Sequence, residues 1–348
     1  MSDKPDYWRY WAAQASEVSP LYARLALAIG ESEELRSLAA RARSGQPHAN
    51  MILGAVHFLL LRGRAHPLAR FYATLGGSSS PTEEDPFPEF ADFVKLHESE
   101  ISSLIETRVT NTNEVGRSAL LHPGLRAVAE KAGAPLNIIE IGPSAGLNLI
   151  WDRYGVRFLR GGVVVAESVT DGALLLDCEL RGNAVPPLGN VPPVARRIGL
   201  ELNPVDLNDE GDRDWLRALI WPDLPARLAR LDQAIAQYRS TEDVIEIRPG
   251  DALDNLLPVL RGIPENEPVC VFHTIALYQF SREMRQTVED LLTVAGLRRP
   301  VFRLSFEQED RARTFGAQLS LIRYHDGMRE AKLLADCQPH GAWIEWRA

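Results

Sequence analysis

The chain has 348 residues, of which 45% are hydrophobic and 24% charged, a composition typical of a folded protein rather than of a disordered chain. The 38 Lys and Arg residues stand against 47 Asp and Glu residues, so the net charge is −9 and a nucleic-acid partner is not expected. Three widely spaced cysteines and the lack of an apolar run of the roughly 20 residues that span a bilayer predict a reduced, cytoplasmic protein outside the membrane.

Residues 1–132 are predicted to form an all-helical domain. Apolar residues recur at helical spacing, for example at Leu21, Leu25 and Ile29, and almost nothing before residue 130 alternates with the period of two that a half-buried strand shows. Proline and glycine residues separate the predicted helices. We expect this domain to act as a lid or substrate domain.

The pattern changes in the remainder of the chain, residues 133–348, where short apolar runs alternate with helical stretches. Strands are predicted at 136–141, 194–202, 244–247, 269–272 and 301–306, with helices over 212–239 and 282–295. Strand–helix alternation of this kind predicts a doubly wound, Rossmann-like α/β sheet with helices on both faces.

Two further β elements are expected in this second domain. Residues 318–324 and 331–335, joined by the turn Asp326-Gly327, predict an antiparallel C-terminal hairpin at the edge of the sheet. The segment at about 155–193 contains alternating and β-branched residues and ends in a proline-rich loop. It predicts a small β insertion at the edge or mouth of the sheet.

The segment at 139–148, I-E-I-G-P-S-A-G-L-N, follows the first predicted strand and is expected to open a helix. Glycines at such a turn let the backbone approach a ligand closely. In S-adenosylmethionine-dependent methyltransferases the turn reads acid-x-Gly-x-Gly-x-Gly, and this segment resembles it with a serine in place of the middle glycine. A carboxylate suits a cationic sulfonium and its amino-acid group better than the phosphates of a dinucleotide. The candidate cofactor residues here are Glu140, Gly142, Ser144, Gly146 and Asn148.

Three later segments resemble further methyltransferase motifs in the same order. Glu201, followed by Asn203, takes the place of the acid that accepts hydrogen bonds from both ribose hydroxyls. Asp251 and Ala252 resemble the segment in which an Asp accepts from the adenine amino group beside a backbone N–H. His273 lies at the carboxyl end of the fourth strand, where ligands meet the switch point of a doubly wound sheet.

Beyond these motifs, nearly the whole chain resembles a bacterial family known as domain of unknown function 2332. The resemblance rests on the turn at 140–148 and on S-P-L-Y at 19–22, T-N-E-V-G-R at 112–117, D-R-Y at 152–154, N-P-V-D at 203–206, W-P-D at 221–223, G-D-A at 250–252 and P-H-G-A-W at 339–343. It implies a methyltransferase-like core and carries no established reaction.

Four residues are candidates for the acceptor side of the site: Asn113, Glu114, Arg117 and His273. They would suit a small polar acceptor, with His273 as a general base because an unperturbed histidine titrates near neutral pH. The structural alternative is a helix cap with an exposed ion pair at 113–117 and a satisfied histidine at the end of a strand. The histidines show no metal-ligand spacing, so no metal is expected.

The favoured interpretation is S-adenosylmethionine-dependent methyl transfer to an unidentified small polar molecule. One alternative is a non-catalytic module on the same fold that binds a nucleoside or another metabolite. Another reads the same turn as the G-x-S-x-G nucleophile elbow of α/β-hydrolases, with Ser144 as nucleophile, Asp251 as one candidate acid and His340 as base. Only helical sequence precedes this turn, which counts against the hydrolase. The sequence leaves the oligomeric state open.

Overall fold

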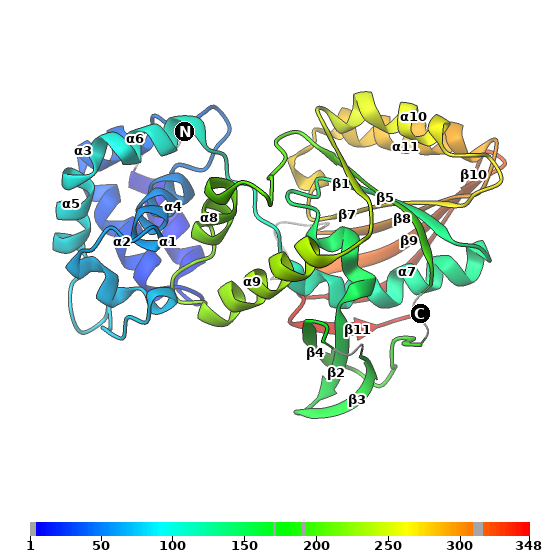
Figure 1. The fold of residues 1–348 in the computed structure, drawn as a ribbon, viewed down its shortest axis with the longest axis horizontal. Helices are drawn as coiled ribbons and strands as arrows, with labels where there is room; N and C mark the ends of the chain where they lie inside the picture. The colour runs from blue at the N-terminus through cyan, green and yellow to red at the C-terminus, as the bar shows by residue number, and fades with distance from the viewer. Residues whose placement is uncertain (1–4, 170–171, 190–191, 309–315) are drawn as a thin grey trace. The chain divides into compact units, whose positions relative to one another are not determined.

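A computed structural model describes residues 1–348 except 1–4, 170–171, 190–191 and 309–315 (Figure 1). The chain divides into two compact units. One consists of Met1–Thr112 with Val205–Asp232, and the other of Asn113–Pro204 with Gln233–Ala348. Within the described ranges, no helix combines the length and the apolarity needed to cross a membrane.

The first unit is helical. Its helices are α1 (Pro5–Ala15), α2 (Pro20–Glu31), α3 (Glu33–Ala39), α4 (His48–Leu61), α5 (Phe87–Leu96), α6 (Glu98–Thr107) and α8 (Glu210–Ala218), with short 3-10 helices η1 (Pro67–Phe71) and η2 (Ala73–Leu75). Helix α4 is apolar around most of its circumference and forms the middle of the core. Its His57 bonds to Ala218 O at 3.1 Å and Thr74 at 2.9 Å, and burial lowers the pKa of His57 to about 4.

Helix α8 lies late in the sequence but completes this helical core. Trp215 of α8 is buried and donates its indole N–H to Val109 O at 2.8 Å, and Leu219 packs in the same cluster. The division into units therefore differs from the boundary expected at 132/133. The pattern of apolar residues locates helices correctly, but it does not show which core a helix joins.

The second unit is built on one mixed sheet of eleven described strands. They are β1 (Leu136–Ile141), β2 (Gly155–Arg160), β3 (Val163–Ser168), β4 (Leu175–Arg181), β5 (Val194–Glu201), β6 (Ile245–Pro249), β7 (Val269–Thr274), β8 (Val301–Glu307), β9 (Ala317–His325), β10 (Met328–Cys337) and β11 (Trp343–Trp346). Their order is β3-β2-β4-β11-β10-β9-β8-β7-β1-β5-β6. The chain is thus a mixed α/β protein, as predicted.

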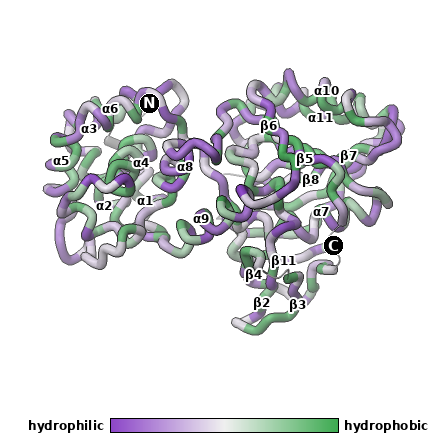
Figure 2. Tube along the Cα trace, in the orientation of Figure 1, coloured by the Kyte–Doolittle hydropathy of each residue, from purple (hydrophilic) through white to green (hydrophobic). Residues whose placement is uncertain are grey.

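The strands β6, β5, β1, β7 and β8 form a parallel block. The chain moves outward from β1 through β5 to β6 and then crosses back to β7, so the order reverses between β1 and β7. Such a reversal is a topological switch point, where ligands bind at the carboxyl ends of the strands in open α/β sheets. The central strands of this block are hydrophobic in Figure 2, as expected for strands that are covered on both faces.

The predicted hairpin and β insertion are both present, but the expectation that the hairpin lies at the edge of the sheet is wrong, because β11, β4, β2 and β3 continue the sheet beyond β10. Strands β9 and β10 pair antiparallel across a turn at Asp326, whose φ is 48°. Strands β2 to β4 lie in the main sheet, because β11 pairs with β10 on one side and with β4 on the other. Strand β11 was not predicted, and it is the element that joins the insertion to the sheet.

Helices cover both faces of the sheet (Figure 1). The remaining elements are α7 (Ser118–Ala132), α9 (Pro225–Ser240), α10 (Ala252–Gly262), α11 (Arg282–Gly296) and the 3-10 helices η3 (Val115–Arg117), η4 (Leu147–Arg153) and η5 (Leu277–Gln279). Helices α10 and α11 pack on one face against Ile139 and Val271. Helix α7 packs on the other, where Gly124 permits close approach: a Cβ there would lie 2.8 Å from Leu304.

Candidate functional site

The two strands at the switch point both end in strained backbone. After β1, Ser144 has φ 56° between Gly142 at 73° and Gly146 at 80°. After β7, Ile275 has φ 51°, which for a β-branched residue is a genuine outlier. The two loops touch, since a Cβ on Gly142 would lie 3.0 Å from Ala276 Cβ. Strain of this kind persists only where the surrounding structure enforces it, and it clusters at functional sites.

Glu140 is the penultimate residue of β1, next to the glycine turn, and is completely buried. Among the described residues, neither of its carboxylate oxygens has a hydrogen-bond partner. Burial, and next the negative charge of Glu201, raise the pKa of Glu140 to about 8, while Arg117 and Asn148 offset part of this effect. A buried carboxyl without a donor is costly, so its position calls for a ligand or a proton.

Glu201, at the end of β5, points its carboxylate at the glycine turn. One oxygen accepts from the backbone N–H of Ser144 at 2.7 Å, and the other accepts from the N–H of Asn203 at 3.0 Å. Glu140 and Glu201 therefore bring two buried carboxyl groups to the same turn. A cation is favoured at such a site, and an anion is repelled.

The turn keeps few backbone donors for an anionic ligand. The N–H of Gly146 bonds to Pro143 O at 2.9 Å, that of Leu147 bonds to Asn113 Oδ1 at 3.0 Å, and that of Ser144 is held by Glu201. In a phosphate-binding loop these donors would face the phosphate. The structure therefore disfavours a phosphate group at this turn.

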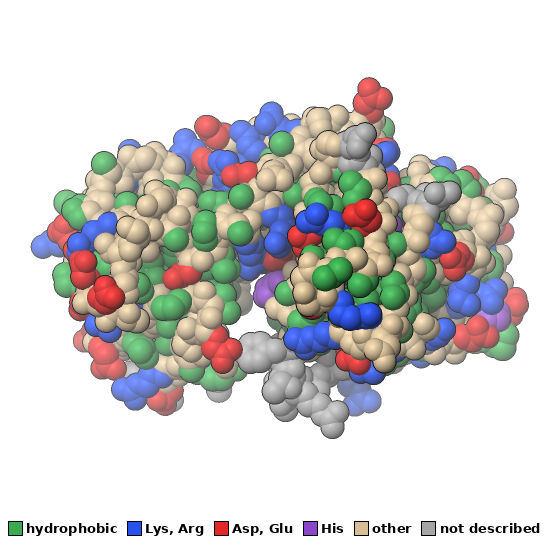
Figure 3. Space-filling view, turned by 90° about the horizontal axis from the view of Figure 1, so that it is seen from below, with side chains coloured by type: hydrophobic (Ala, Val, Ile, Leu, Met, Phe, Trp, Pro, Cys, Tyr) green, Lys and Arg blue, Asp and Glu red, His purple; other side chains and the backbone are tan. Residues whose placement is uncertain are grey.

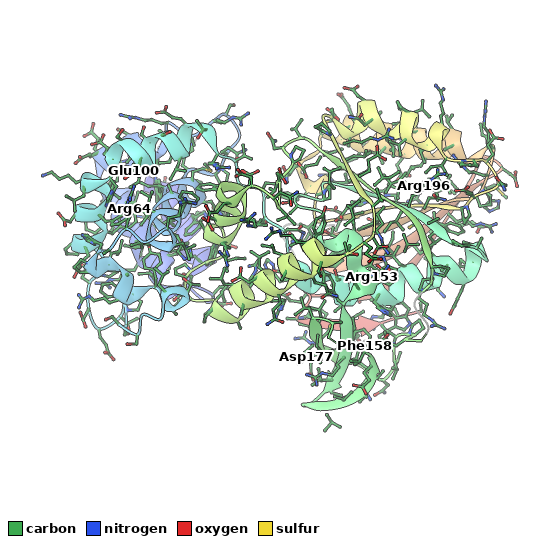
Figure 4. All side chains as sticks on the ribbon, in the orientation of Figure 1. Arg64, Glu100, Arg153, Phe158, Asp177 and Arg196 are labelled. Carbon is green, nitrogen blue, oxygen red and sulfur yellow. The ribbon has the colours of Figure 1, made fainter. Side chains whose placement is uncertain are left out.

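The element after the turn is η4, a 3-10 helix with a kink at Ile150, rather than the α-helix that was expected. Its end is fixed by ion pairs: Arg197 binds Asp152 through two bonds of 2.6 and 2.7 Å, and Arg153 (labelled in Figure 4) binds Asp243 at 2.7 and 2.8 Å. A short, kinked 3-10 helix has no extended dipole, so the expected helix N-terminus does not contribute here.

The segment at 113–118 connects three parts of the site. Arg117 donates to Thr274 O at the end of β7 at 2.8 Å and to Pro339 O at 2.9 Å. Ser118 donates to Asn148 Oδ1 at 2.8 Å, and Asn113 holds the N–H that follows the glycine turn. Asn113, Arg117 and Asn148 therefore position the loops that carry the site.

Asp251 and Ala252 lie where α10 begins. Asp251 caps this helix, its Oδ1 accepting from Leu253 N at 2.8 Å, and it is exposed, while Ala252 is buried. The backbone N–H of Gly250 bonds to the carbonyl of Glu201 at 2.9 Å. The structure thus brings this segment next to the end of β5, as its sequence motif suggested.

His273 does not face the two glutamates. It follows Phe272, which pairs with Glu140, so alternation along the strand turns His273 toward the α11 side of the sheet. Its Nδ1 lies 2.7 Å from Glu307 Oε1, and Arg303 donates to its Nε2 at 2.9 Å. Burial lowers the pKa of His273. The expected role as a general base is not supported. Both ring nitrogens have partners, and the ring lies on the face of the sheet opposite to Glu140.

His273 belongs instead to a buried network that the sequence analysis missed. Glu307 Oε1 also accepts from the N–H groups of Ala276 and Leu277, both at 3.0 Å, and so holds the loop that contains the strained Ile275. The sequence feature that could have indicated this network is Glu307, an acid at the carboxyl end of β8, the strand that follows the one carrying His273. His273 is therefore a positioning residue for this loop.

His340 is the histidine that reaches the surface near Arg117. Its Nδ1 lies 3.4 Å from Glu114 Oε2, and its side chain is 51% exposed while that of Glu114 is 2% exposed. Glu114 Oε1 accepts from Gly116 N at 3.0 Å. The hydrolase alternative paired His340 with Asp251, but Glu114 holds this position and Asp251 caps α10 instead.

Comparison with protein families gives one match. A family described as "Uncharacterized protein conserved in bacteria (DUF2332)" matches residues 7–346. The chain belongs to this family. No curated protein matches the chain.

Several of the stretches that carried the DUF2332 resemblance meet in space within one unit. In the first unit, Ser19 Oγ donates to Asp223 Oδ2, so S-P-L-Y and W-P-D form one capping arrangement at the start of α2. In the second unit, residues 113–117 contact the glycine turn and the loop at 339–341. In the described ranges, no group of three or more His, Cys, Asp and Glu side chains is arranged to hold a metal ion.

Proposed function

We propose that this DUF2332 protein binds S-adenosylmethionine at the carboxyl ends of β1 and β5 and transfers a methyl group to a small polar acceptor. The observation that carries the proposal is Glu140, a fully buried carboxyl group whose oxygens have no donor among the described residues. A cationic ligand would supply that missing partner. With Glu201 beside it, the same site is unsuited to a dinucleotide phosphate.

The other candidate residues fit the remaining parts of this cofactor. The carboxylate of Glu201 accepts the backbone N–H groups of Ser144 and Asn203, and a carboxylate is the kind of acceptor that ribose hydroxyls require. Asp251 uses Oδ1 to cap α10, which leaves Oδ2 for an adenine amino group. Gly142 and Gly146 give the turn its positive φ values, and a Cβ at either would lie close to Ala276 or Ile247, so the shape of the turn requires glycine at both positions.

The cofactor supplies a methyl group on a sulfonium, and the chain must align the acceptor and remove its proton. Alignment in a site shielded from water contributes most to a direct displacement. His340 is the candidate base in place of His273, because its Nδ1 lies 3.4 Å from Glu114 Oε2 and its side chain is half exposed. Asn113 and Arg117 would then act by holding the loops in place.

Isothermal titration of the purified chain with S-adenosylmethionine and with S-adenosylhomocysteine tests the cofactor. We expect both to bind, and Glu201→Ala and Glu140→Gln to weaken binding by about tenfold or more, since each removes a charged hydrogen-bond acceptor. Glu246→Gln, on the exposed side of β6, is the matched control and should bind like the wild type. No binding at millimolar cofactor would contradict the proposal.

A non-catalytic binding module on the same fold remains the second candidate. It is favoured by His273, the residue expected to act as base, because both of its ring nitrogens are occupied. Conversion of S-adenosylmethionine in the presence of a cell extract separates the two. Turnover supports the enzyme, whereas tight binding without turnover supports the module.

A further inference from the structure

A series of polar side chains crosses the buried face of the sheet that α10 and α11 cover. Glu289 of α11 accepts from Arg303 of β8. Arg303 also donates from Nε to Nε2 of His273 at 2.9 Å, and Nδ1 of His273 lies 2.7 Å from Glu307 Oε1. The side chains of His273 and Arg303 are 0 and 9% exposed, so these bonds take the place of water. The series leads from α11 to Glu307, the last residue of β8.

The donors in this series fix the protonation of His273. An arginine Nε always carries a proton and can only donate, so Nε2 of His273 is the acceptor and carries none. The proton of an uncharged imidazole then lies on Nδ1, which donates to Glu307. Burial and the charge of Arg303 lower the pKa of His273, although Glu307 opposes them. The ring is therefore uncharged at neutral pH.

Arg303 is the group that keeps this ring uncharged. The charged and titratable groups around His273 come from several elements: Arg303 and Glu307 from β8, Glu289 from α11, and, in contact with Glu289, Tyr324 from β9 and Arg329 from β10. His273 thus has carboxylates on two sides, Glu307 directly and Glu289 beyond Arg303. Without Arg303 these carboxylates would favour the charged imidazolium.

Glu307 holds the loop that follows β7. Its Oε1 accepts the N–H groups of Ala276 and Leu277, both at 3.0 Å. Ile275, next to them, has φ 51°, a conformation that persists only where its neighbours enforce it. The loop packs on the glycine turn, because a Cβ on Gly142 would lie 3.0 Å from Ala276 Cβ. The position of the loop beside the turn thus depends on Glu307.

We propose that Glu307 and Arg303 are positioning residues for the cofactor site. Glu307 holds the loop at 275–277 against the glycine turn, and Arg303 keeps His273 in the uncharged form that donates to Glu307 from Nδ1. Both act through the loop and not by contact with the ligand. Their effect on the ligand rests on the proposed function, whereas the protonation of His273 and the hold on the loop do not.

Nitrogen NMR of the full chain, labelled at its histidine rings, tests the protonation of His273. At neutral pH we expect Nδ1 to carry the proton and Nε2 to carry none in the wild type. Arg303→Met should raise the pKa of His273 by about one unit or more. A wild-type ring with its proton on Nε2, or a titration that Arg303→Met leaves unchanged, would overturn the proposal. The wild-type measurement decides even where the variant does not fold.

An exposed arginine provides the matched control. Basic and acidic side chains are interspersed on the face drawn in Figure 3, and exposed pairs of such residues contribute little. Arg298 is 76% exposed and pairs with Glu265 at 3.0 Å, so Arg298→Met should leave the titration of His273 unchanged. An equal shift in both variants would indicate a general effect of net charge and would overturn the assignment to Arg303.

Two replacements of His273 separate its two bonds. Asparagine places its amide near the position of Nδ1 and keeps a donor for Glu307, whereas glutamine reaches the position of Nε2 and keeps an acceptor for Arg303. Each loses one bond, so a purely structural role would affect both variants alike. We expect His273→Gln, and not His273→Asn, to speed hydrogen exchange at Ala276 and Leu277 by about tenfold or more. Isothermal titration should show S-adenosylhomocysteine binding weakened by a similar factor.

Exchange and binding distinguish this proposal from the proposed function. Faster exchange in His273→Gln, with no binding by the wild type, would contradict the proposed function and support the hold of Glu307 on the loop. Equal exchange in the two variants would overturn the positioning role whatever the chain binds. Faster exchange with unchanged affinity would show that the loop does not shape the site, and it would also overturn the proposal.

Discussion

Replacing Glu140 by glutamine should stabilise the protein, and by more as the pH rises. The pKa of Glu140 is raised from 4.5 to about 8 by burial and by Glu201. Between these two values the folded chain keeps a proton that the unfolded chain has released. The free energy of unfolding is therefore highest below pH 4.5 and falls as the pH rises through 8. At about 1.4 kcal/mol per pKa unit, the loss is about 5 kcal/mol in all, of which about 3 kcal/mol is lost by pH 7.

Glutamine keeps the shape of the side chain and removes this titration. Wild type and Glu140→Gln should therefore have similar free energies of unfolding near pH 5 and diverge toward pH 9, where the variant should melt higher by roughly 5 °C or more. Urea and thermal unfolding at pH 5, 7 and 9 measure the difference. Glu246→Gln, an exposed carboxyl on β6, is the control and should show no such divergence.

A variant that is no more stable than the wild type at pH 9 would refute this reasoning. So would a difference that is the same at every pH, because that would indicate a packing effect and not a titration. Either result would mean that the Glu140 charge is compensated in the folded protein. It would remove the observation on which the proposed cofactor site depends.

Three further predictions follow from the same contacts. Binding of S-adenosylmethionine should lower the pKa of Glu140 from about 8 and release about 0.9 proton at pH 7 but almost none at pH 9; titration heats that do not depend on the ionisation enthalpy of the buffer would argue against this. Ser144→Gly should stabilise the fold by about 1 kcal/mol, because Ser144 has φ 56°, and a loss of stability on urea unfolding would show that its hydroxyl outweighs the strain. Arg117→Ala should cost about 2 kcal/mol or more, since Thr274 O and Pro339 O lose their donors; an unchanged melting temperature would contradict that role.

Much of the second unit could be predicted from the sequence because buried parallel strands are short runs of apolar, β-branched residues. The first strand at 136–141 and the hairpin turn at Asp326-Gly327 are where the sequence predicts them. Strand β11 could not be predicted, since four residues between two loops show no period. Helix α8 was predicted as a helix, but its membership of the first unit depends on contacts between distant segments.

Some features of the candidate site could likewise be predicted from the sequence, and others could not. Glu140 and Glu201 could be placed together from the sequence because parallel strands end at the same edge of a sheet. The face on which His273 lies follows from alternation: Phe272 pairs with Glu140, so its neighbour faces away. The pairing of Glu114 with His340 joins distant parts of the chain, and nothing local in either segment indicates it.

A crystal structure of the chain grown with S-adenosylhomocysteine or S-adenosylmethionine tests the central claim most directly. We predict that the ammonium group of the ligand lies within hydrogen-bond distance of the Glu140 carboxylate and that both ribose hydroxyls reach Glu201. A ligand bound elsewhere, or an anionic group seated at the turn of Gly142 and Gly146, would contradict the account.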